Sequence, residues 1–496
     1  MAQRDYTISL KQASFPMLSE QQERTVIGGS DKSSSGDPES PGVGYCHNVM
    51  PTSKGLDSVG YLQIVPPYSP VTTLFSDVRI IYGSNRTRLY LGFSSDGSIH
   101  VLKEGSTFWF KLSETFSVDV NQITIGTVNG VSYIYYKSIG CVKYNESTDA
   151  LDTVVLTGLV ASEIVGITAS YGYLIAYTES DIAWSSTIDP TDFTPSAVTG
   201  AGGGSVAGIG GAILFCLPNS LGTLIYTETN TIAGTYTGNV KYPFKYREVD
   251  NSKGGISLDF TAYEANSAAQ FVYSKAGLQS LTSQKAEIIL PEITDFLAGK
   301  KFEDFDETTK TFIVTELTTT MKKKIKFIAS RYLVISYGIS SFTHALIYDI
   351  GLKRLGKLKI AHVDCFEYVG SQKEVSKESI AFLLATGEVS VLNFSTTVES
   401  NGIVIFGKLQ YTRNKIIVLQ GIEVENIDSD AALSVFAQQS LDGKTISSTI
   451  AGNELTSVNK LRKYGFRLSA VNHSILLIGK FNLTTLFIIY TLGGRR

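Results

Sequence analysis

The sequence has little charge, little tryptophan and little sulfur. Charged residues make up 18% of its 496 positions, and the chain holds only two Trp, four Met and four Cys. An average soluble domain carries about a quarter of charged residues, so the shortfall argues against helices with Lys/Glu stripes. Ser, Thr, Gly, 26 Tyr and 25 Phe fill the gap. That composition is typical of strands with hydroxyl-bearing outer faces.

An excess of positive charge is also missing, because the formal net charge is −3. A protein that grips a nucleic-acid backbone usually shows a basic excess. We interpret the basic clusters as solvated strand ends or lysine-protected edge strands. Contact with phosphates or with an acidic partner surface is the alternative. The clusters are Lys322–Lys326, Lys353–Lys359, Arg462–Arg467 and Arg495-Arg496.

No cysteine pair has the spacing of a CxxC motif. We therefore expect reduced, semi-buried thiols in a protein made in a cytoplasm. The N-terminus has no apolar segment of the secretory kind. The apolar segment Ile475–Leu492 contains Lys480, which favours a terminal strand pair over a membrane span. The cysteines are Cys46, Cys141, Cys216 and Cys365.

One turn pattern recurs along the chain. Phe93–Leu102 reads as a strand, an Asp-Gly turn at Gly97 and a second strand. Asn-Gly and Asp-Gly suit primed hairpin turns, whose central residues need positive φ. The pattern returns around Asn129-Gly130, Gly277, Gly387, Asn401-Gly402 and Asp442-Gly443. An all-β chain follows. Because the turns are unevenly spaced, they are compatible with an irregular β-propeller or with several unlike β modules, and we predict the propeller, with about six blades.

The prediction has three parts. Residues 1–60 form an N-terminal arm and loop that includes the Pro/Gly/Ser-rich stretch Ser30–Gly44. Residues 61–400 form the irregular propeller. Residues 401–496, with longer strand patterns, form a sandwich-like or barrel-like β domain. Few helices are expected, and the clearest is Leu290–Gly299, with Pro near its start and Gly at its end.

The common enzyme signatures are absent, including GxSxG, HExxH and a complete P-loop. Gly443-Lys444-Thr445 lacks the upstream Gly of a P-loop and is interpreted as a hairpin turn. Gly202-x-Gly204-x-x-Ala207 resembles a dinucleotide fingerprint, yet no βαβ pattern surrounds it. We interpret its surroundings, Gly200–Gly211, as a flexible or tightly turning connector.

A few residues could in principle carry chemistry. His362-x-Asp364-Cys365 and Cys46-His47 contain metal-ligand types, and Asp189 and Asp192 place two acids close together. We favour core or surface roles for the first two motifs, and an Asp-Pro turn with an Asx cap for the acids. The sequence thus predicts no catalytic, cofactor-binding or metal-binding residue, and no enzyme activity.

Several stretches, in order along the chain, resemble one family. Asn48–Leu62, which ends in Gly-Tyr-Leu shortly before Pro66-Pro67, is similar to the N-terminal signature of tail nozzle proteins of short-tailed bacteriophages. This chain has Pro-Tyr where that signature has Pro-Gly. Later stretches of the chain are similar to later elements of the family. These are Ser170–Phe193 with Trp184, Gly208–Tyr226, Ala345–Asp349 with Leu355–Leu358, and Gly465–Leu468.

The resemblance implies a structural protein of the virion, also called a tail hub or packaged-DNA stabilisation protein. Such subunits form a ring, typically a hexamer, below the portal and its adaptor ring. The ring closes the tail channel, retains packaged DNA until ejection, and carries the needle, fibres or spikes. It implies assembly in the host cytoplasm, no membrane insertion and no cofactor. A nearly neutral wall suits this role, because each retained phosphate contact would slow the exit of DNA. Ser30–Gly44 and Gly200–Gly211 are candidate gating or neighbour-contact segments.

Two other interpretations stay open. The chain could be a carbohydrate-binding β-propeller in receptor recognition, with Trp109, Trp184 or exposed Tyr residues stacking on sugar rings. It could also be a propeller hydrolase, which would need a convergent carboxylate cluster that the sequence does not identify.

Overall fold

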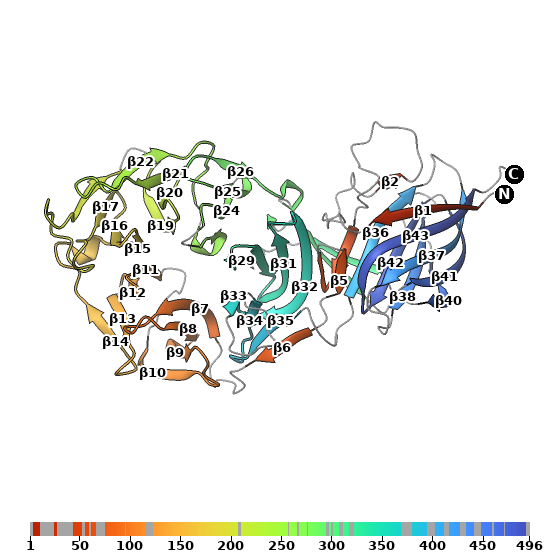
Figure 1. The fold of residues 1–496 in the computed structure, drawn as a ribbon, viewed down its shortest axis with the longest axis horizontal. Coiled ribbons are helices and arrows are strands. Elements are labelled where there is room, and N and C mark those ends of the chain that lie inside the picture. The colour runs from red at the N-terminus through yellow and green to blue at the C-terminus, as the bar shows by residue number, and fades with distance from the viewer. Residues whose placement is uncertain are drawn as a thin grey trace.

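The computed structural model contains a propeller and a β-sandwich side by side (Figure 1). Apart from the 3-10 turns η3 (Ala161–Glu163), η4 (Leu258–Phe260) and η5 (Pro291–Ile293), the named elements of its described part are strands, which confirms the all-β prediction. The described residues are 3–9, 24–26, 43–51, 55–58, 61–65, 75–94, 96–115, 123–206, 210–255, 257–264, 267–274, 276–293, 297–298, 301–306, 311–316, 322–368, 379–393, 402–410, 416–426, 433–440, 448–458, 461–470 and 472–492.

Seven four-stranded antiparallel units, which we number as blades 1 to 7, form the propeller among the described residues. The prediction of a propeller is confirmed. The seven blades among the described residues are one more than the expected number of about six. The blades follow one another around a ring (Figure 1).

The strands of blades 1 to 4 run in chain order from the inner strand to the outer strand. Blade 1 is β7 (Phe75–Tyr82), β8 (Arg88–Ser94), β9 (Ser98–Lys103) and β10 (Phe110–Thr115); blade 2 is β11 (Thr124–Val128), β12 (Val131–Tyr136), β13 (Gly140–Asn145) and β14 (Ala150–Val154). Blade 3 is β15 (Gly166–Ser170), β16 (Tyr173–Tyr177), β17 (Asp181–Trp184) and β18 (Gly202–Ser205); blade 4 is β19 (Ile213–Asn219), β20 (Gly222–Thr227), β21 (Thr231–Tyr236) and β22 (Phe244–Glu248).

Blades 5 to 7 complete the ring. Blade 5 is β23 (Thr261–Ala262), β24 (Gln270–Ser274), β25 (Gly277–Leu281) and β26 (Ala286–Ile288); blade 6 is β29 (Lys322–Ile328), β30 (Tyr332–Gly338), β31 (Phe342–Asp349) and β32 (Arg354–His362). Blade 7 is β33 (Asp364–Tyr368), β34 (Ser379–Leu383), β35 (Val389–Asn393) and, as its outer strand, β6 (Tyr61–Val65) from the start of the chain.

The recurring turns are left-handed, as the sequence predicts. Asn129 and Gly130 have φ of 52° and 78° and join β11 to β12, the combination that a type I′ hairpin needs. Gly97, Gly277 and Gly387 also have positive φ, at hairpins of blades 1, 5 and 7. The predicted turn at Asp442-Gly443 lies outside the described residues, as does Asn401.

The ring is closed by a strand from the start of the propeller that pairs with the last blade. β6 pairs antiparallel with β35 over five residues, from Val65 opposite Val389 to Tyr61 opposite Asn393. Blade 7 therefore takes its outer strand from the segment before blade 1. Because backbone hydrogen bonds must form for this blade to be complete, the two ends of the propeller are held together.

The sandwich consists of two sheets around a shared apolar core. Its long strands lie between Gly402 and Leu492, within the range 401–496 where the sequence shows longer strand patterns. One sheet holds β37 (Ile417–Asn426), β40 (Asn453–Val458), β41 (Leu461–Ala470) and β43 (Asn482–Leu492); the other holds β36 (Gly402–Gln410), β38 (Leu433–Ser440), β39 (Ser448–Ala451) and β42 (Asn472–Gly479).

The N-terminal residues were expected to form an irregular arm, but several of them are strands of the sandwich. β1 (Gln3–Ser9) pairs along its whole length with β43. β2 (Arg24–Val26) and β3 (Val43–His47) both pair with β36. These strands form because an existing sheet edge offers them backbone partners, which a local pattern cannot reveal. Most of the predicted loop Ser30–Gly44 lies outside the described residues.

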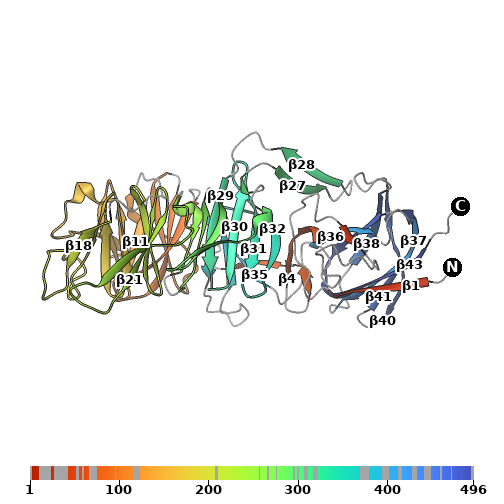
Figure 2. The same ribbon diagram turned by 90° about the horizontal axis from the view of Figure 1, so that it is seen from above.

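One sheet continues from the propeller into the sandwich. The outer strand of blade 6, β32, pairs with β4 (Val49–Pro51). β4 forms a hairpin with β5 (Leu56–Ser58), which pairs with β43. The apolar core is also continuous, since one cluster contains Leu346 of blade 6, Leu56 of the link and Ile488 of the sandwich. The sheet and the core therefore connect the two domains, which lie side by side (Figure 2).

Two other expectations need comment. The predicted helix Leu290–Gly299 begins as the 3-10 turn η5, and Ile293 and Leu297 are buried against the common core, while residues 294–296 and 299 lie outside the described part. Within Gly200–Gly211, Gly202–Ser205 form β18. A separate hairpin of β27 (Lys301–Asp306) and β28 (Thr311–Glu316) stands near the junction of the domains (Figure 2).

Candidate functional site: the central channel of the propeller

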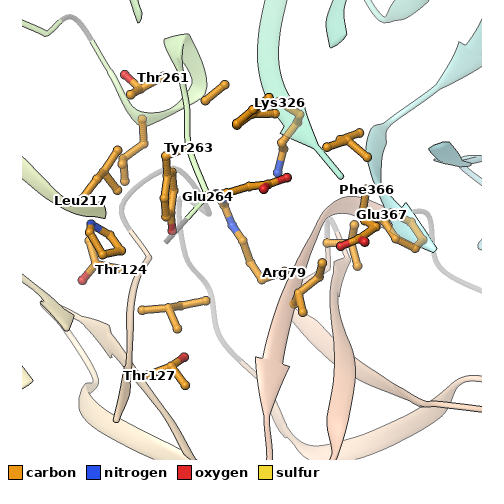
Figure 3. Close-up of a pocket in the computed structure, with 18 of the residues that line it drawn as sticks. Arg79, Thr124, Thr127, Leu217, Thr261, Tyr263, Glu264, Lys326, Phe366 and Glu367 are labelled. Atoms are coloured by element: carbon orange, nitrogen blue, oxygen red, sulfur yellow. The ribbon is translucent and has the colours of Figure 1, made fainter. Parts of the chain in front are cut away.

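The inner strands of all seven blades surround a cavity of about 460 Å³. Residues of β7, β11, β15, β19, β23, β29 and β33 line it. Figure 3 shows Arg79, Tyr263 and Lys326 entering the cavity from different sides. We take this channel as the candidate site, because it combines a concave space with ionisable side chains.

A buried ion network lies on one side of the channel and connects blades 1, 6 and 7. The ammonium of Lys324 lies 2.5 Å from Oδ1 of Asp77 and 3.1 Å from Oδ2 of Asp364. Arg79 pairs with Asp77 at 2.8 Å, and Lys326 lies 3.4 Å from Asp364. Three cations thus meet two carboxylates that are almost completely buried.

Strand geometry explains how these side chains come together. Side chains two positions apart in a strand point to the same face. Asp77 and Arg79 therefore share a face of β7, and Lys324 and Lys326 share a face of β29. Asp364 is the first residue of β33.

Backbone groups complete the network. The Val78 N–H donates to Oδ1 of Asp77 at 2.8 Å and reaches Oδ2 of Asp364 at 3.2 Å. The Cys365 N–H donates to Oδ1 of Asp364 at 2.8 Å. Paired cations and backbone N–H donors together offset the cost of burying a carboxylate in the core.

The two carboxylates differ in their protonation. Burial alone would raise the pKa of Asp77, but Arg79 and Lys324 outweigh it and hold that pKa well below its ordinary value. Burial raises the pKa of Asp364 to about 6, because Lys324 and Lys326 offset burial only in part and the charge of Asp77 adds to it. Burial also lowers the pKa of Lys326, and Lys324 and Arg79 add to that effect.

A second contact between blades 1 and 7 lies beside the network. Arg88 donates to the carboxylate of Glu367 at 3.2 Å and to its backbone carbonyl at 3.1 Å. The Tyr90 hydroxyl donates to the same carbonyl at 3.3 Å. The region where the chain closes its ring is therefore joined by polar contacts as well as by β6.

The structure places the sequence-predicted candidates in structural roles. His362 is buried, and its ring nitrogens contact Ser336 Oγ at 2.7 Å and the Ile360 carbonyl at 2.8 Å. Burial lowers the pKa of His362 to about 4. The described residues contain no group of three or more His, Cys, Asp or Glu that could hold a metal ion. Cys46 and its neighbour His47 are buried, and all four cysteines are free and buried.

The paired acids form turns, as predicted. Asp189 accepts the N–H and the hydroxyl of Thr191, both at 2.8 Å. Asp192 accepts the N–H of Thr194 at 2.9 Å. The dinucleotide-like glycines Gly202 and Gly204 lie on a strand, β18, and not on a strand-to-helix turn.

The interpretation of the basic clusters as solvated is wrong for several members. Lys324 and Lys357 are buried, and Arg354 is buried with a hydrogen bond to the Gly55 carbonyl at 3.0 Å. These side chains lie in the ion network or at the junction with the sandwich, so they do not form a basic surface. Lys463 does pair near the surface, with Glu423 at 2.7 Å. Arg495-Arg496 and Gly443–Thr445 lie outside the described residues.

The sequence did not identify Asp77 and Arg79 as site residues. The available signal was two opposite charges at alternate positions of the apolar strand Phe75–Tyr82. A charged pair on a strand that is otherwise apolar indicates an ion pair in the core more than a solvated face. Its partners were unpredictable, because they lie 247 and 287 positions later.

Comparison with known proteins adds little to this description. No protein-family model and no curated protein matches the chain. Similar solved structures include that of U3-55K (TM-score 0.41, 8% identity, covering 67% of this chain and 98% of that one). Another is YCF48 from Cyanidioschyzon merolae (TM-score 0.38, 13% identity, covering 67% and 99%). The propeller assignment rests on the strand order of this chain.

None of the described residues belongs to a helix with the length and apolarity that a membrane span requires.

Proposed function

We propose that this chain is a structural subunit of the tail nozzle, or tail hub, of a short-tailed bacteriophage. In this role it forms a ring, of six copies in our proposal, that closes the tail channel, retains packaged DNA and releases it during ejection. The observation that carries the proposal is the sheet that runs from blade 6 through β4 and β5 into β43. A wall that holds DNA under pressure needs domains that do not hinge.

The family-like stretches fall on this framework. The N-terminal signature, Asn48–Leu62, includes the link strands β4 and β5 and the start of the closing strand β6. Ala345–Asp349 and Leu355–Leu358 pair with each other in blade 6, with Ala345 opposite Leu358. Trp184 is buried and donates to the Gly200 carbonyl at 2.9 Å. The resemblance therefore concerns positions that determine how the chain folds.

The distribution of charge supports passage of DNA without tight binding. Lys324 is paired with a buried acid, and Lys357 is buried at the domain junction. Since a phosphate contact needs an accessible cation, these residues cannot hold a DNA backbone. We propose that the role is not enzymatic, and that the partners are the portal adaptor ring above and the needle, fibres or spikes below. The virion tail is the proposed location.

Electron microscopy of the purified protein, with and without a portal–adaptor complex, tests this proposal. We expect six-fold rings, or rings that form on the adaptor and extend its channel. A protein that stays monomeric and ignores the complex would refute the ring role. A matched control is the same mixture with a portal that lacks its adaptor, on which no ring should assemble.

Carbohydrate recognition gains no support from the two tryptophans. Trp109 and Trp184 are 7% and 8% exposed, and Trp109 donates to the Gly387 carbonyl at 2.9 Å. Neither ring can stack on a sugar without local unfolding. A glycan array that gave saturable binding, abolished by replacing the exposed Tyr171 or Tyr242, would favour the carbohydrate-binding interpretation.

A further inference from the structure

The charges of the propeller channel nearly balance. Among the described residues, the lining and the ion network behind it hold five carboxylates and four cations, so a single carboxylate is in excess. The carboxylates are Asp77, Asp259, Glu264, Asp364 and Glu367, and the cations are Arg79, Arg88, Lys324 and Lys326. Because both signs surround the same space, a ligand with a net charge meets repulsion as well as attraction. The channel therefore favours a ligand without net charge.

Two lining residues have a buried polar atom without a hydrogen-bond partner in the described part of the chain. The atoms are Oδ1 of Asp259, an acceptor, and Nε of Arg88, a donor. Asp259 lies in the turn η4, between blades 4 and 5, and Arg88 begins β8 of blade 1. Leaving such atoms unpaired is unfavourable, so water or a ligand that both donates and accepts is stabilised there. A hydroxyl group does both, whereas an apolar ligand does neither.

Much of the remaining lining consists of hydroxyl-bearing and apolar side chains. Thr124 and Thr127 of blade 2 lie across the cavity from Phe366 of blade 7 (Figure 3). Tyr263 enters from the side of blade 5 (Figure 3). The apolar members include Ile125, Ile167, Ala169 and Leu217. Small-molecule sites combine polar groups that fix orientation with apolar surface, so a molecule with hydroxyls on its edge and C–H groups on its faces matches this lining.

Solvent reaches polar groups of the lining but hardly reaches the carboxylates behind them. The side chains of Arg79, Lys326 and Glu367 are 18%, 22% and 31% exposed. Those of Asp77 and Asp364 are 3% and 0% exposed. A small solute can therefore contact donors and acceptors of the lining while the buried ion pairs stay intact.

We propose that the channel binds a neutral polyhydroxylated molecule of about the size of a monosaccharide. Its hydroxyls donate to Asp259 and accept from Arg88, while its C–H faces pack against Ile167, Ala169 and the ring of Tyr263. The cavity of about 460 Å³ is within the range of small-molecule sites. Hydrogen bonds to ionised groups are stronger than those between neutral groups, so an uncharged ligand is still held firmly by this lining.

Ligand-observed NMR titration of the isolated protein with five probes tests this proposal. We expect saturable binding of D-glucose and of myo-inositol. Cyclohexanol, a ring of similar size with one hydroxyl, should not bind. D-Gluconate and protonated D-glucosamine carry charges of opposite sign, and both should bind more weakly than D-glucose. The two charged probes therefore separate recognition of hydroxyls from attraction to a net charge of either sign.

Asp259→Ala is the main variant, because it removes the acceptor that has no partner among the described residues. Loss of one hydrogen bond to a charged group should weaken binding of the preferred probe about tenfold or more. Asp181→Ala is the matched control, since Asp181 is exposed, accepts from the Ser180 hydroxyl at 2.6 Å and does not line the channel. The control should bind like the wild type.

A second variant keeps the test decisive if Asp259→Ala does not fold. Ala169→Leu adds bulk to the apolar part of the lining and should weaken binding of the same probe by filling part of the cavity. The proposal is overturned if neither neutral probe saturates, if a charged probe binds more tightly than D-glucose, or if the folded variants bind like the control. The proposal is independent of the proposed ring role, because every titration uses the isolated subunit.

Discussion

Lys324 of blade 6 donates a hydrogen bond to Asp77 of blade 1, which precedes it by 247 positions. Between them lies Asp364 at the start of blade 7, which accepts from the same ammonium. One lysine thus spans three consecutive blades at the place where the ring closes. The pairing of β6 with β35 closes the ring at its outer side, and this network joins it at the inner side.

Replacing Lys324 should destabilise the protein strongly. Lys324→Met leaves two buried carboxylates with less compensation, and loss of one partner of a buried pair costs about 3–5 kcal/mol. The control Lys103→Met removes an ion pair near the surface, which is worth about 0–1 kcal/mol. Urea denaturation of both variants measures the difference. Equal midpoints for the two variants would contradict a stabilising role of the network.

Asp364 should make stability depend on pH in a particular direction. Its pKa is raised to about 6, so the folded state binds this proton more tightly than the unfolded state. The contribution of Asp364 to the free energy of unfolding therefore increases as the pH falls from above 6 toward 4, by at most about 1.4 kcal/mol per pH unit. Asp77, whose pKa is lowered, acts in the opposite direction and only below about pH 4, where its stabilisation is lost.

The difference between wild type and Asp364→Asn isolates this effect. Burial lowers the pKa of both His362 and His473 to about 4, so each histidine lowers the free energy of unfolding as the pH falls below about 6.5. Both histidines are present in the wild type and in the variant, so their effect is common to the two. Denaturation curves at several pH values should show that the free energy of unfolding of the wild type rises relative to that of the variant as the pH falls from 7 to 4. A gap that stayed constant over this range would exclude Asp364 as the titrating group.

A side chain at Gly356 should disturb the junction of the two domains. A Cβ there would lie 2.5 Å from Met50 Sδ and 2.7 Å from the Val49 carbonyl, and the latter is backbone of β4. We expect Gly356→Ala to lower the melting temperature by several degrees and to expose the link to proteases. Gly204→Ala is the control, because nothing lies within 4 Å of its Cβ position. Resistance of the link to cleavage in Gly356→Ala would argue against tight packing there.

Replacing a residue of the closing strand β6 by proline should open the ring at one position and have little effect at the next. Successive N–H groups of a strand point in opposite directions, so one of Gln63→Pro and Ile64→Pro removes a hydrogen bond to β35 and the other does not. Hydrogen exchange of blade 7 should rise strongly in one variant and weakly in its neighbour. Equal behaviour of both would indicate that β6 contributes little to closure.

The local part of the fold could be predicted from the sequence. Asn129-Gly130 determines its own hairpin through backbone preferences of two residues, and Gly402–Gln410 shows the long apolar pattern of a sandwich strand. By contrast, β1 exists because β43 offers an edge, and nothing within Gln3–Ser9 indicates that partner. The number of blades was uncertain for a different reason, since the recurring turns mark blades 1, 2, 5 and 7 but not blades 3, 4 and 6.

The candidate site was harder to predict than the fold. The lysines of Lys322–Lys326 were interpreted as an edge strand in solvent, and β29 is indeed an edge of its blade. The edge faces the ring centre, however, where acids from two other blades bury Lys324. Solvation of an edge depends on what lies next to it, which is decided by contacts across hundreds of residues.

The late pairing of β6 has a consequence for synthesis of the chain. Val65 leaves the ribosome 324 residues before its partner Val389 (389 − 65). At roughly 5–20 residues per second, that is a wait of about 15–65 seconds. During this time the nascent protein is an open arc of blades whose last blade does not yet exist. Chaperones that act on nascent chains should therefore engage this protein until translation is almost complete, and truncation before residue 389 should leave an arc that aggregates.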